Sequence, residues 1–278
     1  MPELPEVETI IRNLRRGCLQ DGSAGVSLIG QTAHSAHLFW NRSLSSPSAA
    51  EFLQRLPGQT VNDLTRRGKF LVFGLSQDYL LIHLRMSGDL RLETSGESPA
   101  LRKHDRLVLV FESGLRLIFH DPRKFGRIWL VQDPATVLGG LGPEPLDEDF
   151  TVESLYDRLQ ARRRALKPLL LDQSFLAGLG NIYTDEALHL AGLHPNRISS
   201  SISREESGRL WNAIRTVLEE GIRRNGASID WVYRGGEYQN HFRVYGRAGE
   251  ACSVCGTPVQ RLVVGQRGTY ICPHCQPF

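Results

Sequence analysis

The sequence contains little lysine, little methionine and no long apolar segment. Four of its 33 lysine and arginine residues are lysine, and two of its 278 residues are methionine. No apolar run approaches the roughly 18 to 20 residues that a membrane-spanning helix requires, and the N-terminus lacks the apolar core of a secretory signal peptide. These absences disfavour a membrane protein and predict a cytoplasmic one. With 41% hydrophobic and 23% charged residues, the chain should fold, and it is long enough for two domains.

The net charge of +3 at pH 7 is too small to indicate a partner by itself. Because almost every basic residue is arginine, the positive charge is carried mainly by planar guanidinium groups, which pair well with phosphate. Basic clusters occur at 66–69, 123–127 and 158–167. Such clusters suggest a phosphate-binding track, although a solvated protein face can have the same pattern.

Residues 1–130 predict one helix followed by short strands. Apolar residues recur at helical spacing over 5–17, with a proline in the first turn and a glycine at the end. Short β-branched or aromatic runs then occupy 69–75, 79–86, 89–93, 106–121 and 126–131. Glu112–Gly114 suits a hairpin turn. Many short strands after a single helix favour an antiparallel sandwich or barrel.

The rest of the sequence predicts a linker and a helical domain. Residues 131–149 are rich in proline, glycine and acidic residues, as expected of a linker before a second domain at 150–242. Helical patterns cover 151–166, 181–191 and 203–225. The last opens with a serine and a glutamate in capping-box spacing, and glycines before residue 181 predict a helix-turn-helix-like arrangement. The fold class is therefore α+β with several domains.

Four of the five cysteines lie in the last 27 residues. They form two Cys-x2-Cys pairs separated by 16 residues, a spacing typical of four-cysteine zinc sites. The expected ligands of one Zn2+ are Cys252, Cys255, Cys272 and Cys275. Four protein ligands fill a tetrahedral zinc site, so this ion would be structural. A pair of disulfides is the alternative, which the lack of a secretion signal disfavours.

The segment between the two cysteine pairs predicts a β-hairpin with its tip at 265–268. Arg267 would then lie at or near an exposed turn of a metal-stabilised module at 243–278. Spacing alone leaves two interpretations of this arginine, a solvated turn residue or a phosphate contact.

Nine short motifs are distributed along the whole chain. They are MPELPEVET at 1–9, RRGKFL at 66–71, HLRMSGDLR at 83–91, KHD at 103–105, HDPRKFG at 120–126, LGPEPL at 141–146, GLGNIYTDEAL at 178–188, VYGRAGE at 244–250 and the cysteine pairs. Together they resemble the formamidopyrimidine-DNA glycosylases, bacterial enzymes of base-excision repair. The resemblance implies an N-terminal antiparallel β-sandwich with a leading helix, a helical helix-two-turn-helix domain and a zinc-ribbon hairpin.

The resemblance also implies a bifunctional glycosylase and abasic-site lyase. Its nucleophile would be the secondary amine of Pro2 once the initiator methionine is removed, since an α-amino pKa of roughly 7.7 to 8.0 leaves part of it neutral at physiological pH. Glu3 is expected to be the general acid/base, and Glu6 to position water and the amine. Lys69 is expected to donate the proton for β-elimination, unless it is an ordinary solubilising lysine, and Arg267 to serve δ-elimination.

The partner implied by the resemblance is duplex DNA containing an oxidised base or an abasic site. We expect a monomer to bind it at the nucleoid of a bacterial cell. Flipping a nucleotide leaves a hole in the duplex, which Met86, Arg123 and Phe125 would fill, although Met86 could instead pack in a strand core. The expected DNA contacts are Met86, His104, Arg123, Phe125, Arg163 and Asn181. Asn181 would begin a helix, whose N–H groups also attract anions.

One segment departs from the family pattern. Residues 227–242 carry Trp231 and Tyr233 where a threonine-rich segment and a lesion-capping loop are usual, and Tyr238 falls near a lesion-loop aromatic. Strand cleavage is still expected, but the preference for 8-oxoguanine over formamidopyrimidines stays open. Two alternatives are a non-catalytic damage sensor, which would not need the intact catalytic set, and a pyrimidine-specific relative, which usually begins Pro-Glu-Gly-Pro-Glu.

Overall fold

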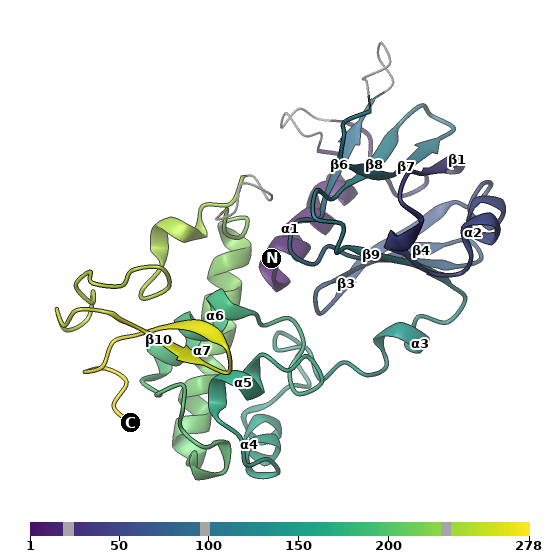
Figure 1. Ribbon diagram of the computed structural model, residues 1–278. Coiled ribbons are helices and arrows are strands. Elements are labelled where there is room, and N and C mark those ends of the chain that lie inside the picture. The colour runs from purple at the N-terminus through teal and green to yellow at the C-terminus, as the bar shows by residue number, and fades with distance from the viewer. Residues whose placement is uncertain (19–24, 95–100, 229–234) are drawn as a thin grey trace. The chain divides into compact units, whose positions relative to one another are not determined.

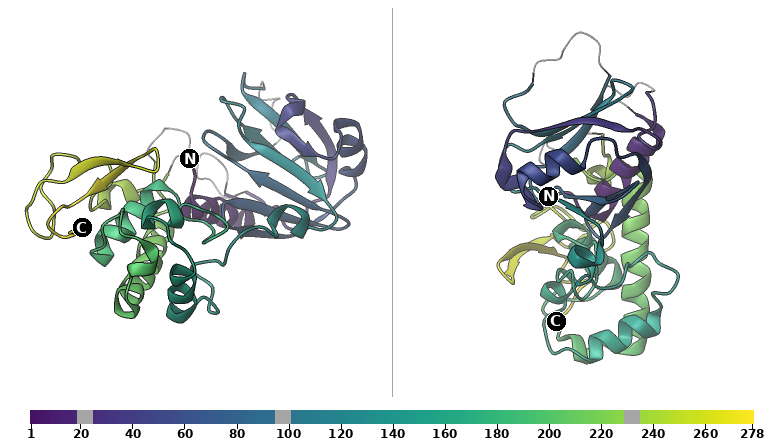
Figure 2. Two further views of the ribbon diagram at one scale, coloured as in Figure 1. Left: turned by 60° about the horizontal axis from the view of Figure 1, so that its bottom comes forward. Right: turned by 90° about the vertical axis from the view of Figure 1, so that its right-hand side faces the viewer.

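The computed structural model describes residues 1–18, 25–94, 101–228 and 235–278, and its ribbon is shown in Figures 1 and 2. The chain divides into two compact units, which are described separately. Among the described residues, unit 1 comprises Met1–Pro2 and Glu6–Gly139, and unit 2 comprises Glu3–Pro5, Gly140–Ser228 and Gly235–Phe278. No helix in these ranges is both long and apolar enough to cross a bilayer.

Unit 1 contains two β-sheets. The first has the strand order β1 (Ala33–Leu38), β7 (Asp105–Phe111), β8 (Arg116–His120), β6 (Asp89–Glu93). The second has the order β2 (Leu44–Ser46), β9 (Arg127–Val131), β5 (Tyr79–His83), β4 (Phe70–Leu75), β3 (Val61–Arg67). Its helices are α1 (Leu4–Arg16), which belongs to this unit from Glu6 onward, η1 (Asn41–Ser43), α2 (Ala49–Arg55) and α3 (Ala135–Leu138). The strand pairs are antiparallel, as predicted, except for the short parallel pair of β2 and β9.

The apolar stripe of α1 packs in the same core as side chains of both sheets. Val7, Ile11 and Leu14 are at most 3% exposed, and they cluster with Phe73 of β4 and Phe119 of β8. Burial of each such side chain contributes about 1.5 to 3 kcal/mol relative to exposure. The predicted leading helix is therefore confirmed, and the core holds it against the sheets.

One predicted strand in unit 1 is shorter than expected, and one helix was not predicted. The strand expected at 79–86 ends at His83, because Arg85 has a φ of 55°, a left-handed conformation that does not fit a pleated strand. Met86 consequently lies outside the strand and is 42% exposed, so the alternative of core packing is wrong. Helix α2 was not predicted, although Ser48 caps it by accepting a hydrogen bond from the Glu51 N–H. The hairpin turn between β7 and β8 is confirmed.

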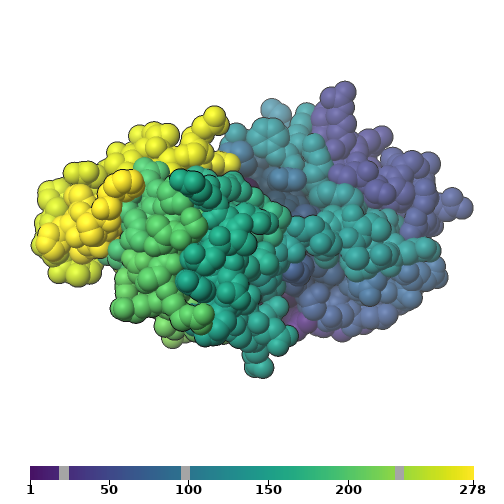
Figure 3. Space-filling model, turned by 90° about the horizontal axis from the view of Figure 1, so that it is seen from below, coloured from purple at the N-terminus to yellow at the C-terminus, as the bar shows by residue number. Residues whose placement is uncertain are grey.

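Unit 2 consists of helices and one hairpin. Its elements are α4 (Val152–Gln160), α5 (Leu166–Leu170), α6 (Asn181–Ala191), η2 (Ser199–Ser201), α7 (Arg204–Arg223), η3 (Tyr238–His241), β10 (Gln260–Val264) and β11 (Arg267–Ile271). Helix α6 packs against both α7 and β11, and the yellow C-terminal segment lies against the green helical segment in Figure 3. The predicted capping box of Ser203 and Glu206 is present. Glu186 of α6 is fully buried and accepts hydrogen bonds from the N–H groups of residues 243–245.

The helix expected at 151–166 is two helices. Helix α4 ends at Gln160, and α5 begins only at Leu166. Between them the main chain bonds to a distant segment instead of to the preceding turn: the Arg164 N–H donates to Ser199 Oγ at 3.3 Å, and the Leu166 N–H donates to Arg197 O at 2.9 Å. These long-range hydrogen bonds replace the i to i−4 bonds of a continuous helix.

Candidate active site and DNA-binding surface

The carboxylate of Glu3 lies at the N-terminus of α6 within unit 2. Its oxygens accept hydrogen bonds from the N–H groups of Gly180 at 2.7 Å, Ile182 at 2.9 Å and Tyr183 at 3.4 Å. The side chain is 2% exposed. Unpaired N–H groups and the helix dipole both favour a negative charge at this position. The residue bonded to Pro2 is thereby fixed by main-chain donors.

This contact changes the expectation for the start of α6. The N–H groups that were predicted to face a phosphate are occupied by Glu3. A Cβ at Gly180 would lie 2.3 Å from Glu3 Cδ, so a side chain at this position would have to displace the carboxylate. Asn181 donates through Nδ2 to Gly268 O at 3.0 Å and to Tyr245 Oη at 3.5 Å, so it links α6 to β11. Its phosphate contact stays a prediction.

The expected nucleophile, Pro2, and the second expected catalytic carboxylate, Glu6, both belong to unit 1. Pro2 lies two residues before α1, and Glu6 lies in the first turn of that helix, where it is 2% exposed. A carboxylate in a first helical turn is stabilised by the helix dipole. Pro2 and Glu6 are therefore both buried at the N-terminal end of α1, Pro2 just before the helix and Glu6 in its first turn.

Lys69 occupies the tight turn between β3 and β4. Its side chain is 5% exposed, which excludes the alternative of a solubilising surface lysine. Strand β4 pairs Phe70 with His83 of β5. Burial first, and then the positive charges of Arg85 and Lys69, lower the pKa of His83 to about 3. The lysine therefore lies beside a neutral imidazole in the interior of unit 1.

Arg267 is the first residue of β11 and is exposed, as predicted. The turn before it consists of Gly265 and Gln266, whose φ values of 54° and 62° are those of a tight two-residue hairpin turn. The hairpin is in register from Gln260–Ile271 to Val264–Arg267. The guanidinium group is therefore presented to solvent at the end of a fully paired hairpin.

A buried ion pair attaches this hairpin to the helices of unit 2. Lys167 Nζ lies 2.6 Å from Asp185 Oδ1, and both side chains are fully buried. Lys167 Nζ also donates to Gly268 O at 3.0 Å and Thr269 Oγ1 at 2.8 Å, while Asp185 Oδ2 accepts the Tyr270 N–H at 3.0 Å. Burial lowers the pKa of Lys167 and raises that of Asp185, and the charge of each partner opposes these shifts. This pair was not predicted from the sequence, although Lys167 lies in the basic cluster at 158–167 and Asp185 in the GLGNIYTDEAL motif at 178–188.

The four predicted zinc ligands converge. The sulfur atoms of Cys252, Cys255, Cys272 and Cys275 all lie within 4.8 Å of one another. Four thiolates at about 2.3 Å from one tetrahedral zinc ion would be about 3.8 Å apart. The sulfur atoms of Cys252 and Cys275 are 4.0 Å apart and those of Cys255 and Cys272 are 3.4 Å apart, distances that agree with this arrangement and exceed the length of a disulfide bond. These cysteines form a site for one structural Zn2+.

The three side chains expected to fill the duplex lie on two loops of unit 1. Met86 follows β5, and Arg123 and Phe125 lie between β8 and β9. Met86 and Phe125 are 42% and 46% exposed, although both are apolar. The Arg123 guanidinium lies 5.1 Å from the centre of the Phe125 ring. Exposed apolar side chains on neighbouring loops are suited to insertion between bases.

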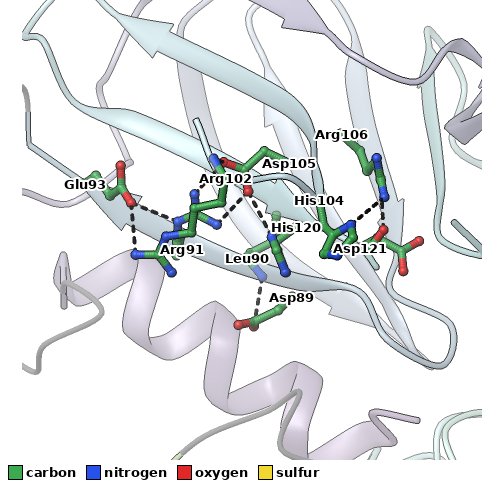
Figure 4. A network of polar contacts seen from close by, with 10 residues as sticks. All are labelled: Asp89, Leu90, Arg91, Glu93, Arg102, His104, Asp105, Arg106, His120 and Asp121. Atoms are coloured by element: carbon green, nitrogen blue, oxygen red, sulfur yellow. Dashed lines mark hydrogen bonds and ion pairs between the residues drawn. The ribbon is translucent and has the colours of Figure 1, made fainter. Parts of the chain in front are cut away.

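His104 lies at the end of a polar network in unit 1 (Figure 4). Arg91 and Asp105 form a buried bidentate pair at 2.8 and 2.7 Å, and Asp105 also pairs with His120 at 2.9 Å. Partial desolvation and then nearby positive charges, beginning with Arg106, lower the pKa of His104. The network holds the segment that carries His104 and leaves that imidazole partly exposed.

The predicted phosphate track includes several residues that have structural roles. Arg66 pairs with Glu8 at 3.2 Å. Arg158 donates to Phe175 O at 2.7 Å, and Lys167 is the buried partner described above. Only part of the basic clusters is therefore available for phosphate. Arg163 is exposed in the loop between α4 and α5 and remains a predicted DNA contact.

Tyr238, which falls near a lesion-loop aromatic of the family pattern, lies in the core of unit 2. Tyr238 is fully buried and stacks on Tyr183 with ring centres 5.1 Å apart. Its ring belongs to the same apolar core as side chains of α6 and α7. Trp231 and Tyr233, which were expected to alter the lesion loop, lie outside the described residues.

Comparison with known families matches almost the entire chain. Residues 1–128 match the formamidopyrimidine-DNA glycosylase N-terminal domain, residues 141–232 its H2TH domain, and residues 249–277 the zinc finger found in FPG and IleRS.

Similar proteins and structures cover the same length. Proteins named formamidopyrimidine-DNA glycosylase include one from Protochlamydia amoebophila, 42% identical over 285 residues and 99% of both chains, and one from Chloroflexus aurantiacus, 44% identical over 284 residues, 99% of this chain and 98% of the other. A structure of MutM in complex with carbocyclic 8-oxo-G containing DNA has a TM-score of 0.89 and 36% identity, covering 100% of both chains. Lactococcus lactis Fpg in complex with abasic-site DNA gives the same TM-score and identity, covering 99% and 100%. The chain belongs to the formamidopyrimidine-DNA glycosylase family.

Proposed function

We propose that this DNA glycosylase and abasic-site lyase removes oxidised purines, 8-oxoguanine and formamidopyrimidines, through a covalent intermediate on Pro2. The observation that carries the proposal is the carboxylate of Glu3, which is fixed by main-chain N–H groups and belongs to the residue that follows Pro2 in the chain. A nucleophile with an adjacent, positioned acid/base group is the arrangement that covalent catalysis requires. We infer that the enzyme acts on nucleoid DNA in the bacterial cytoplasm.

The proposed chemistry begins after Met1 is removed. The neutral amine of Pro2 attacks C1′ of the damaged nucleotide, a C–N bond forms, and the glycosidic bond breaks as the base leaves with a proton. Glu3 moves protons to and from the sugar as its ring opens. Loss of a 2′ proton from the resulting iminium breaks the 3′ C–O bond, and the 3′ phosphate leaves. A second elimination, with loss of a 4′ proton, breaks the 5′ C–O bond, and the 5′ phosphate leaves.

The remaining predicted residues serve those eliminations and the duplex. We assign proton donation in β-elimination to Lys69 and assistance to δ-elimination to Arg267, with Glu6 positioning water and the amine. Met86, Arg123 and Phe125 would occupy the space left by the flipped nucleotide. His104, Arg163 and Asn181 would contact phosphates, which fix register without reading sequence.

A second substrate class has one specific observation in its favour. A complex of Lactococcus lactis Fpg with oxidised-pyrimidine DNA has a TM-score of 0.89 and 35% identity to this chain. Comparison of excision from 8-oxoguanine and thymine-glycol duplexes distinguishes the two classes. Preferred excision of 8-oxoguanine supports the proposal, whereas preferred excision of thymine glycol contradicts it.

Borohydride trapping tests the covalent step directly. Protein with a free Pro2 should form a reduced adduct with an 8-oxoguanine duplex, because borohydride reduces an iminium to a stable amine. A matched form that retains Met1 should form no adduct while it keeps its zinc and binds the same duplex. The proposal fails if Pro2-terminated protein binds the duplex but forms no adduct, or if the Met1 form reacts equally well.

A further inference from the structure

We propose that Asp121 and Ser87 are positioning residues that hold the Met86 loop (84–88) and the Arg123–Phe125 loop (121–126) as one rigid pair. This inference rests on the proposed function, in which side chains of these loops fill the duplex at the flipped nucleotide. The amine chemistry at Pro2 does not involve either residue. The proposal therefore concerns how the duplex is engaged.

One buried carboxylate bridges the two loops. Asp121 Oδ1 accepts the hydroxyl proton of Ser87 at 2.5 Å, and Asp121 Oδ2 accepts the Gly126 N–H at 2.8 Å. Ser87 Oγ in turn accepts the Arg123 N–H at 3.2 Å. Asp121 is fully buried and Ser87 is 2% exposed. Hydrogen bonds to a buried charged group are stronger than neutral ones, so this chain of contacts is a firm link.

Both loops also close over the same aromatic ring. A Cβ at Gly88 would lie 2.8 Å from Phe119 Cε2, and a Cβ at Gly126 would lie 2.3 Å from Phe119 Cζ. Phe119 is 1% exposed and belongs to the core of unit 1. Each loop therefore packs its glycine onto a ring that cannot move without disturbing that core.

The main chain beside the exposed side chains is strained. Arg85 and Lys124 have φ values of 55° and 63°, a left-handed conformation that is unfavourable for residues with a Cβ. Arg85 immediately precedes Met86, and Lys124 lies between Arg123 and Phe125. Such conformations persist where surrounding contacts over-determine them. The hydrogen bonds of Asp121 and Ser87 are contacts of this kind.

Asp121 further connects the loops to the His104 segment. Its carbonyl accepts a hydrogen bond from Arg106 Nε at 2.8 Å, and its N–H donates to His104 O at 2.9 Å. Figure 4 shows the contacts of Arg106 with both His104 and Asp121. The three parts of unit 1 expected to touch DNA thus meet at one residue.

The test compares two substrates with Ser87→Ala. Excision of 8-oxoguanine from a duplex requires the loops, whereas cleavage of single-stranded DNA at an existing abasic site has no opposite strand to hold and no base to flip. Loss of a hydroxyl that bridges a buried carboxylate and an N–H should lower the first rate roughly tenfold. The second rate should change little. Ser113→Ala, at an exposed turn of the same unit, should change neither.

A double-mutant cycle with Met86→Ala excludes a merely structural effect. If Ser87 acts through placement of Met86, the two substitutions are non-additive and Ser87→Ala has a smaller effect in the Met86→Ala background. Asp121→Asn provides a second variant with the same expectation. Equal losses on both substrates, no loss, or full additivity would overturn the proposal. Failure of the wild-type protein to form a trapped adduct on either substrate would instead refute the proposed function.

Discussion

The Glu3 carboxylate accepts the N–H of Gly180 at 2.7 Å, a contact between residues 177 positions apart in sequence. It joins the residue that follows the proposed nucleophile to the start of α6. The proposed acid/base group is thus held by backbone donors, whose directions are fixed by the helix. A group held in this way needs no rearrangement before it acts.

Gly180→Ala should impair catalysis by displacing Glu3. The new Cβ would meet Glu3 Cδ at 2.3 Å, so the carboxylate must leave at least part of its three N–H donors. We expect excision of 8-oxoguanine to fall by roughly 10² to 10⁴-fold, the range typical of a lost general acid/base. Gly208→Ala in α7 is the matched control. The new Cβ would lie 3.8 Å from Val152 Cγ1 of α4, an ordinary van der Waals distance. Equal rates in the two variants would contradict the role assigned to this contact.

Lys167→Met should destabilise unit 2 by leaving Asp185 buried without its partner. Removal of one member of a buried ion pair costs about 3 to 5 kcal/mol. The double variant Lys167→Met/Asp185→Asn removes both charges and keeps an acceptor for the Tyr270 N–H. Its free energy of unfolding, measured by denaturant titration with far-UV circular dichroism, should recover at least half of that loss. A double variant no more stable than the single one would show that charge burial is not the cause.

Removal of zinc should release the hairpin that carries Arg267. Structural zinc binding to zinc-finger peptides is worth about 10 to 16 kcal/mol at pH 7. We expect one zinc per chain by metal analysis, and loss of zinc and of most duplex affinity in Cys255→Ser. Cys18→Ser, which lies outside the cysteine cluster, should retain both. Duplex affinity that survives complete zinc loss would separate the hairpin from DNA binding.

His83 should make the folded state sensitive to acid. Its Nδ1 accepts the Arg85 N–H at 3.1 Å, and its pKa is lowered to about 3 from 6.5. The unfolded chain therefore binds a proton first as the pH falls. The stability due to the neutral ring is complete above about pH 6.5 and is lost toward pH 3 at about 1.4 kcal/mol per pH unit.

His83→Asn isolates that contribution, because the amide oxygen can accept the same N–H and does not titrate. Between about pH 6 and 4 the free energy of unfolding of this variant should decline less steeply than that of the wild-type protein, by about 1.4 kcal/mol per pH unit. His34→Asn, at an exposed position of β1, should have the wild-type slope. Identical slopes in all three proteins would exclude His83 as the source.

Local patterns in the sequence were sufficient for α1, the capping box of α7 and the zinc ligands, because each depends on spacing within one segment. The break after α4 was not predictable, since it depends on hydrogen bonds from 164–166 to 197–199. The end of β5 depends on the left-handed backbone conformation of Arg85. Nothing in the local sequence predicts that conformation for an arginine. The expected catalytic and DNA-contact residues came from the family resemblance. Their supports, such as Gly180 for Glu3 and Asp185 for the hairpin, depend on tertiary contacts.

The anchoring of Glu3 on α6 also sets an order of events during synthesis. A chain emerges from the ribosome N-terminus first, but Glu3 can reach the N–H groups of residues 180, 182 and 183 only after two-thirds of the protein has been made. The segment 243–245 then joins Glu186 on the same helix, and Tyr270 joins Asp185. The proposed active end is thus assembled late: a nascent chain that stops before α6 contains Glu3 but lacks the N–H groups that hold its carboxylate.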